Sequence, residues 1–141
     1  MKEKYICFAL FFSLVSIPAF AEGIPIEPGK WEMTSTMSMP MLPQPRVNTS
    51  TECIEESELS PETMTEGDMD SSCAFKDMTV DGNTMKWSMD CDANGGASRG
   101  EWEVTSHGDS LAGEGTLTVD VQGQAMVMTM NWDGKRVGGC D

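Results

Sequence analysis

Four oxygen-bearing side chains in the segment DCDANGGASRGE have the spacing of a calcium-binding loop. They match the pattern D-x-[DN]-x-[DN]-G-x5-E around a turn glycine and are Asp90, Asp92, Asn94 and Glu101. Their carboxylate and amide oxygens are the ligands that Ca²⁺ prefers. An EF-hand loop joins two helices, however, whereas the flanking residues TMKWSMD and EWEVTSH alternate like strands. The other interpretation is therefore a glycine-rich connection whose acidic side chains face water.

Two runs of alternate methionines suggest a second kind of metal site. One run is Met37, Met39 and Met41, and the other is Met126, Met128 and Met130. Thioether sulfur is a soft ligand that suits Cu(I), and spacing by two places each run on one strand face. The competing explanation is core packing, because methionine is adaptable and the chain has 13 of them. The sequence favours packing, so no cofactor is expected, with Cu(I) and Ca²⁺ as the alternatives.

Four cysteines lie beyond the N-terminal segment, and an even number in a small exported domain predicts two disulfides. They are Cys53, Cys73, Cys91 and Cys140. A turn signal, DGN at 81–83, lies midway between Cys73 and Cys91, so a hairpin favours that pair and leaves Cys53 for Cys140. The pairing of Cys53 with Cys73 and of Cys91 with Cys140 stays open, because one residue of register separates the two solutions.

No catalytic constellation is visible in the sequence. His107 is the single histidine and precedes a turn glycine, where a lone histidine is usually solvated. The chain has neither a G-x-S-x-G motif nor a phosphate-binding glycine loop. We therefore expect that the protein is not an enzyme.

The N-terminus predicts export. A basic MKEK, an apolar YICFALFFSLVSI and the small-x-small sequence Ala19-Phe20-Ala21 form a signal peptide, with cleavage expected after residue 21. Its apolar stretch is short for a membrane span, so we expect no transmembrane segment and a location in the periplasm or outside a bacterial cell. Residues 22–28, with two prolines, are interpreted as a leader, and 29–141 as one domain.

The net charge of −14 argues against nucleic acid as a partner, because phosphates would be repelled. A basic protein or a hydrophobic small molecule is the partner that remains.

Alternation of apolar and polar residues dominates the chain and predicts strands that are buried on one side. Examples are KWEMTSTMSM, TMKWSMD, GEWEVTSH, LTVDV and QAMVMTMNW, with turn signals at 82–83, 107–109, 122–123 and 133–134. One short helix is expected near 59–66, with Ser60 as N-cap and Pro61 in the first turn. The prediction is an all-β, mainly antiparallel fold, in which seven to eight strands form a meander that makes a small barrel or a strongly bent sheet.

Several short motifs together resemble a family of exported bacterial proteins. They are PGKWE at 28–32, a Met/Pro segment at 37–45, TECI at 51–54, a Gly-Asn turn at 82–83 that leads to Trp87 and Cys91, and RVGGC at 136–140. The family is the domain-of-unknown-function family 3617. The resemblance implies an envelope location and a disulfide-bonded β domain, but no activity and no catalytic residues.

These features predict an exported, acidic, methionine-rich envelope protein that serves as a non-enzymatic binding or structural module. A metal-handling protein is one alternative. A carrier of a hydrophobic ligand is the other, because methionines can line an adaptable pocket at the mouth of a barrel. Side chains that fill the interior completely would leave no such pocket.

Overall fold

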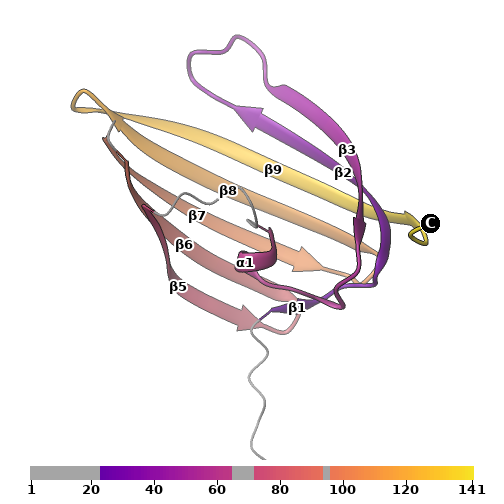
Figure 1. The fold of residues 1–141 in the computed structure, drawn as a ribbon. Helices are drawn as coiled ribbons and strands as arrows, with labels where there is room; N and C mark the ends of the chain where they lie inside the picture. The colour runs from indigo at the N-terminus through magenta and orange to yellow at the C-terminus, as the bar shows by residue number, and fades with distance from the viewer. Residues whose placement is uncertain (1–22, 65–71, 94–95) are drawn as a thin grey trace, which may run out of the picture.

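The computed structural model describes residues 23–64, 72–93 and 96–141, which form nine strands and one short helix (Figure 1). In chain order these are β1 (Ile24–Pro25), β2 (Gly29–Ser38), β3 (Arg46–Ile54), β4 (Glu58–Leu59), α1 (Pro61–Met64), β5 (Cys73–Asp81), β6 (Thr84–Ala93), β7 (Gly96–Ser106), β8 (Ser110–Val121) and β9 (Gln124–Gly138). The segment expected to be a signal peptide, 1–21, lies outside the described residues. Within the described ranges, no helix has the length and apolarity needed to cross a membrane.

Seven strands form one antiparallel sheet in the order β3-β2-β9-β8-β7-β6-β5. Strands β5 to β9 follow one another as a meander, and the β2–β3 hairpin adds to the free side of β9. The edge strands β3 and β5 do not pair with each other, and Figure 1 shows the sheet as an open, curved shell. The predicted antiparallel all-β fold is confirmed, as a bent sheet rather than as a closed barrel.

The last predicted turn, at 133–134, is wrong. Strand β9 runs through it without a break, from Gln124 to Gly138. Gly134 instead lies under two apolar side chains, because a Cβ at this position would stand 2.6 Å from Met33 Sδ and 2.8 Å from Leu111 Cγ. The glycine is needed there for close packing and not for a change of direction.

The alternation of side chains gives the sheet two chemically different faces. One of them, which we call the inner face, carries the buried core residues Trp31, Met85, Val104 and Leu111, each at most 4% exposed. The opposite, outer face is polar; on it, Lys86 of β6 is paired with Glu103 of β7. The period-two pattern in the sequence thus identifies the buried face of each strand.

Short segments cover one end of the inner face. Ile24 of β1 pairs with Leu59 of β4, and both join the hydrophobic core together with Ile26. The hydroxyl of Ser106, itself fully buried, donates a hydrogen bond of 2.6 Å to the carbonyl oxygen of Pro25 and holds β1 against the end of β7. Ile24 and Ile26, which lie in the segment expected to be a leader, 22–28, are thus core residues.

The short helix completes this cover. Ser60 caps α1: the Thr63 amide donates to Ser60 Oγ at 3.4 Å, and the Met64 amide donates to the Ser60 carbonyl oxygen at 3.1 Å. Pro61 occupies the first helical position and is buried, and Met64 packs against the core. The helix predicted near 59–66 is therefore confirmed over Pro61–Met64, and residues 65–66 of the predicted range lie outside the described residues.

The two ends of the inner face differ in how much of them is covered. The covered end, beneath β1, β4 and α1, holds Trp31, Met85, Trp87, Val104 and Leu111. The open end holds side chains that are half-buried and that belong neither to the described core cluster nor to the residues packed against it; these are Met37, Leu117, Val119, Met126, Met128 and Met130.

Glycines allow large rings to lie flat on the sheet between these two ends. A Cβ at either Gly100 or Gly115 would collide with the indole of Trp102, so this ring covers both glycines. Trp102 also stacks on Trp87 of the neighbouring strand, with ring centroids 5.9 Å apart and an interplanar angle of 13°. Such an offset stack stabilises the sheet beyond the apolar area that it buries.

Candidate functional site

A pocket of about 380 Å³ lies between α1 and the covered end of the inner face. Its apolar lining comes from strands β2, β3, β4, β8 and β9 and from the helix, and comprises Met33, Ile54, Leu59, Met64, Leu111 and Trp132. The volume falls within the range of small-molecule sites, which are mostly apolar clefts. Two thioethers beside an indole give this lining an adaptable shape.

The rim of this pocket is polar and acidic. Ser35, Ser50 and Thr63 contribute hydroxyls, and Glu52 and Glu56 contribute carboxylates. Both glutamates are exposed, so their charges lie at the mouth and not in the interior. Since no basic residue lines the pocket, the electrostatic potential at its mouth favours a neutral or positively charged group over an anion.

A larger hollow, of about 690 Å³, lies mainly on the other face of the sheet and is more open to solvent. Most of the side chains that line it belong to the polar outer face, among them Lys86, Glu101, Glu103 and Glu114. It is a broad trough across several strands, whereas ligand sites are usually enclosed and apolar with a few polar groups. We therefore place the candidate site in the smaller pocket.

Three of the four candidate calcium ligands lie within the described residues, on two neighbouring strands. Asp90 and Asp92 lie on β6 and Glu101 lies on β7, while Asn94 lies outside the described residues. Arg99 stands among these acids, with Nη1 3.6 Å from Asp90 Oδ1 and Nε 3.8 Å from Glu101 Oε1. The described residues contain no group of three or more histidine, cysteine or acidic side chains that could hold a metal.

A lysine is the closest cationic partner of Asp90. Lys76 Nζ lies 2.9 Å from Asp90 Oδ2. The hydrogen bond from Lys76 lowers the pKa of Asp90 below its ordinary value; desolvation opposes this shift, and the positive charges of Lys76 and Arg99 add to it. The same hydrogen bond raises the pKa of Lys76. Asp90 is therefore engaged with Lys76 and Arg99 on the outer face.

The methionines proposed as copper ligands are brought together only in part. Met37 of β2 is paired directly with Met130 of β9, and Met128 lies two residues further along the same face. Met126 lies beyond them, and Met39 follows the end of β2. Met41 is in a loop and is 77% exposed. The structure thus joins members of two runs that the sequence pattern presented as separate sites.

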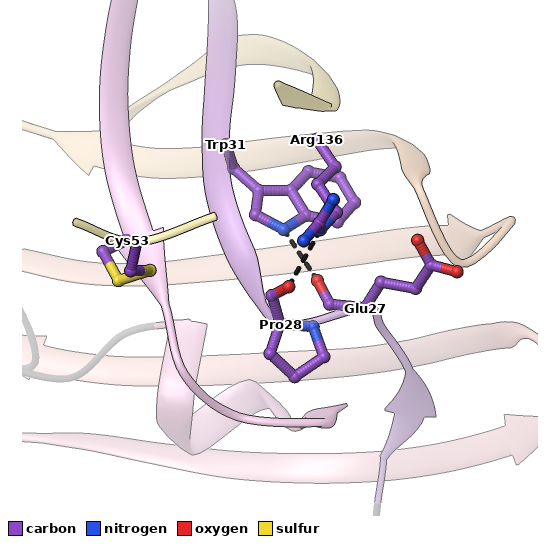
Figure 2. Close-up of a disulfide and its surroundings, with 6 residues drawn as sticks. Glu27, Pro28, Trp31, Cys53 and Arg136 are labelled. Atoms are coloured by element: carbon purple, nitrogen blue, oxygen red, sulfur yellow. Dashed lines mark hydrogen bonds between the residues drawn. A yellow bond between two sulfur atoms is a disulfide. The ribbon is translucent and has the colours of Figure 1, made fainter. Parts of the chain in front are cut away.

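Three of the family motifs, at 28–32, 51–54 and 136–140, meet at one corner of the sheet, where they hold the strands together (Figure 2). The indole Nε1 of Trp31 donates to the Glu27 carbonyl oxygen at 2.9 Å, and Arg136 Nε donates to the Pro28 carbonyl oxygen at 2.8 Å. Gly29, at φ 152°, permits this approach, because a Cβ there would lie 2.5 Å from Arg136 Nε.

Two disulfides complete the framework. Cys53 is bonded to Cys140 beside this corner, and Cys73 is bonded to Cys91 across the β5–β6 pair. This is the pairing that the hairpin argument favours. Cys53 also lines the candidate pocket, so the first disulfide fixes β3 at the point where the chain leaves it for β4 and α1.

Sequence reasoning missed the residues that make the pocket. Ile54, Leu59 and Met64 belong to a stretch that is rich in acidic residues and in which only a short helix is predicted. Their apolar side chains at 54, 59 and 64, separated by acids and hydroxyls, fit neither strand nor helix periodicity. The N-cap at Ser60 is the one local signal that pointed to structure in this stretch.

Residues 26–140 match the sequence family described as Protein of unknown function (DUF3617). No curated protein and no solved structure matches the chain. The matched range includes the corner, both disulfides and the whole pocket lining. The chain belongs to the DUF3617 family, as its motifs indicated.

Proposed function

We propose that this protein is a non-enzymatic binding module of the bacterial envelope that holds a small amphiphile in the pocket beneath α1. The pocket itself is the observation that carries the proposal: a cavity of about 380 Å³ that combines six apolar side chains with a polar, acidic rim, as an amphiphile requires. A ligand with an apolar tail would replace water against Met33, Met64 and Trp132. Each buried methylene of such a tail would stabilise the complex by about 0.8 kcal/mol.

The polar group of the ligand should be neutral or cationic. Glu52 and Glu56 stand at the mouth, and the chain carries a net charge of −14. An anionic headgroup would be repelled, whereas an ammonium group would be attracted. The same charge would suit a basic protein partner on the surface of the domain.

Export is part of the proposal. The N-terminal segment has the composition of a signal peptide, and two disulfides persist only in an oxidising compartment. Absence of enzymatic activity stays a prediction.

Binding of dodecyltrimethylammonium to the oxidised protein, measured by calorimetry, tests this function. Dodecanoate, which has a similar tail and the opposite charge, is the matched probe. We expect saturable 1:1 binding of the cation and at least tenfold weaker binding of the anion. Equal affinity for both would contradict the role of the acidic rim, and no binding of either would contradict the pocket.

A variant whose pocket is filled by a larger side chain provides a second test of the proposed function. Ser35 lines the pocket and lies opposite Trp132, so Ser35→Trp should occupy the cavity and weaken binding at least tenfold. Thr36→Trp is the control, because Thr36 is the next residue of β2, faces the outer side and is paired with Asn131. Unchanged affinity in Ser35→Trp would place the amphiphile elsewhere, and thermal unfolding shows whether either variant is still folded.

A further inference from the structure

Six of the described methionines form two groups with different surroundings. Met85 is fully buried, and Met33 and Met64 pack against the core. Met37, Met128 and Met130 are half-buried at the open end and do not belong to that packed set. Core packing therefore explains the first group and does not explain the second.

Pairing of β2 with β9 brings sulfur atoms from distant parts of the sequence into one neighbourhood. Met37 is directly opposite Met130, and opposed side chains in antiparallel strands have Cβ atoms about 4.5–5.5 Å apart. Met128 is the diagonal neighbour of Met37 on the same face, at a distance of about 7–8 Å that long side chains can bridge. Three thioethers can thus converge above the β2–β9 pair.

On its other side, Met130 is opposite a glycine that an indole ring covers. Its partner on β8 is Gly115, which has no side chain, and the indole of Trp102 lies over this glycine. An aromatic ring therefore covers the strand position next to Met130. On this face Met37 is flanked along β2 by Ser35, and Met130 is flanked along β9 by Met128 and Trp132. Across the β2–β3 pair Met37 is opposite Arg46, whose side chain is exposed to solvent.

We propose that Met37, Met128 and Met130 form a binding site for Cu(I). Thioethers are soft and suit this ion, and they carry no proton that binding must displace. The four cysteines described in the structure are held in disulfides and do not compete as thiolates. The net charge of −14 attracts a cation to the surface. This site is separate from the pocket beneath α1 and does not depend on the amphiphile.

Competition with a chromophoric Cu(I) chelator, in the presence of ascorbate and without oxygen, measures the affinity of the oxidised protein. The variants are Met37→Leu and Met130→Leu, since leucine conserves volume and removes the sulfur. We expect one Cu(I) per chain in the parent and at least a tenfold loss of affinity in each variant. Met41→Leu is the control, because Met41 is exposed in a loop away from the site, and it should bind as the parent does.

A second readout locates the metal directly. Ag(I), which is redox-inert and equally soft, should shift the ¹³C-labelled methyl signals of Met37, Met128 and Met130 in NMR spectra. The methyl signals of Met33 and Met85 should stay in place. Absence of Cu(I) binding to the parent would overturn the proposal, as would equal losses of affinity in Met41→Leu and Met37→Leu or shifts confined to other methionines.

Discussion

The covered and open ends of the inner face are built from the same strands and the same residue types, yet their side chains have different environments. Met85 at the covered end is fully buried, while Met128 at the open end is half-buried. The difference comes from β1, β4 and α1, which add a second layer over one end. Alternation along a strand therefore determines which face is apolar, and a separate set of short segments determines how much of that face is shielded from solvent.

The largest expected effect on this comparison comes from the disulfide that holds the cover. Cys53 and Cys140 are 87 residues apart, whereas Cys73 and Cys91 are 18 apart. Because a longer closed loop restricts the unfolded chain more, replacing Cys53 and Cys140 by serine should cost about 4–5 kcal/mol of unfolding free energy, and replacing the other pair about 3 kcal/mol. Urea denaturation of the two double variants measures both losses. The reverse order would show that the corner beside Cys53 does not secure the covered end.

A pair of methionine truncations compares the two ends directly. Met85→Ala should lower the free energy of unfolding by about 2–5 kcal/mol, because it leaves a cavity in the core. Met128→Ala should cost about 1 kcal/mol or less, because this side chain already touches water. Met→Leu at each position is the control for lost sulfur at conserved volume. Similar losses for the two alanine variants would mean that the open end is covered in solution.

The boundary between the two ends can be tested at a glycine. A Cβ at Gly115 would meet the indole of Trp102, so Gly115→Ala should displace this ring from its stack on Trp87 and cost about 1–3 kcal/mol. Gly139→Ala is the control, since nothing lies within 4 Å of a Cβ built there. Near-ultraviolet circular dichroism reports the stacked indoles. An unchanged spectrum in Gly115→Ala would contradict the stacking of the two rings.

The sequence reveals the sheet more fully than it reveals the site. Regular alternation around Trp31, Trp87 and Val104 predicts strands and their buried faces, because the period of two is a local property. The cover is hidden, because Ile24 and Leu59 sit in segments too short to show any period. The Asp133-Gly134 pair led to the wrong prediction of a turn, because the sequence alone does not distinguish a glycine that allows close packing from a glycine that allows a turn. The pairing of Met37 with Met130 depends on which strands become neighbours, which is a property of the whole fold.

The smallest expected effect lies on the outer face, where Asp90 contacts Lys76. The hydrogen bond lowers the folded-state pKa of Asp90, so the pair stabilises the fold above the unfolded-state value of about 3.9 and the effect is lost as pH falls through the folded value. The pKa of Lys76 is raised in the folded state, so this residue matters at high pH: the stability that it contributes is lost as pH rises through its folded-state pKa. Both side chains are partly exposed, so the change in stability should be slight.

NMR titration of the Asp90 carboxyl carbon measures this effect at its source. In the parent protein, the pKa of Asp90 should lie below the ordinary range of an aspartate, and Lys76→Gln should raise it toward that range. Lys86→Gln is the control: it removes the partner of Glu103 and should leave the pKa of Asp90 unchanged. A pKa of Asp90 within the ordinary range in the parent protein would mean that Lys76 does not bind Asp90 in solution. That carboxylate would then be free for a cation, and the calcium interpretation of residues 90–101 would regain its first ligand.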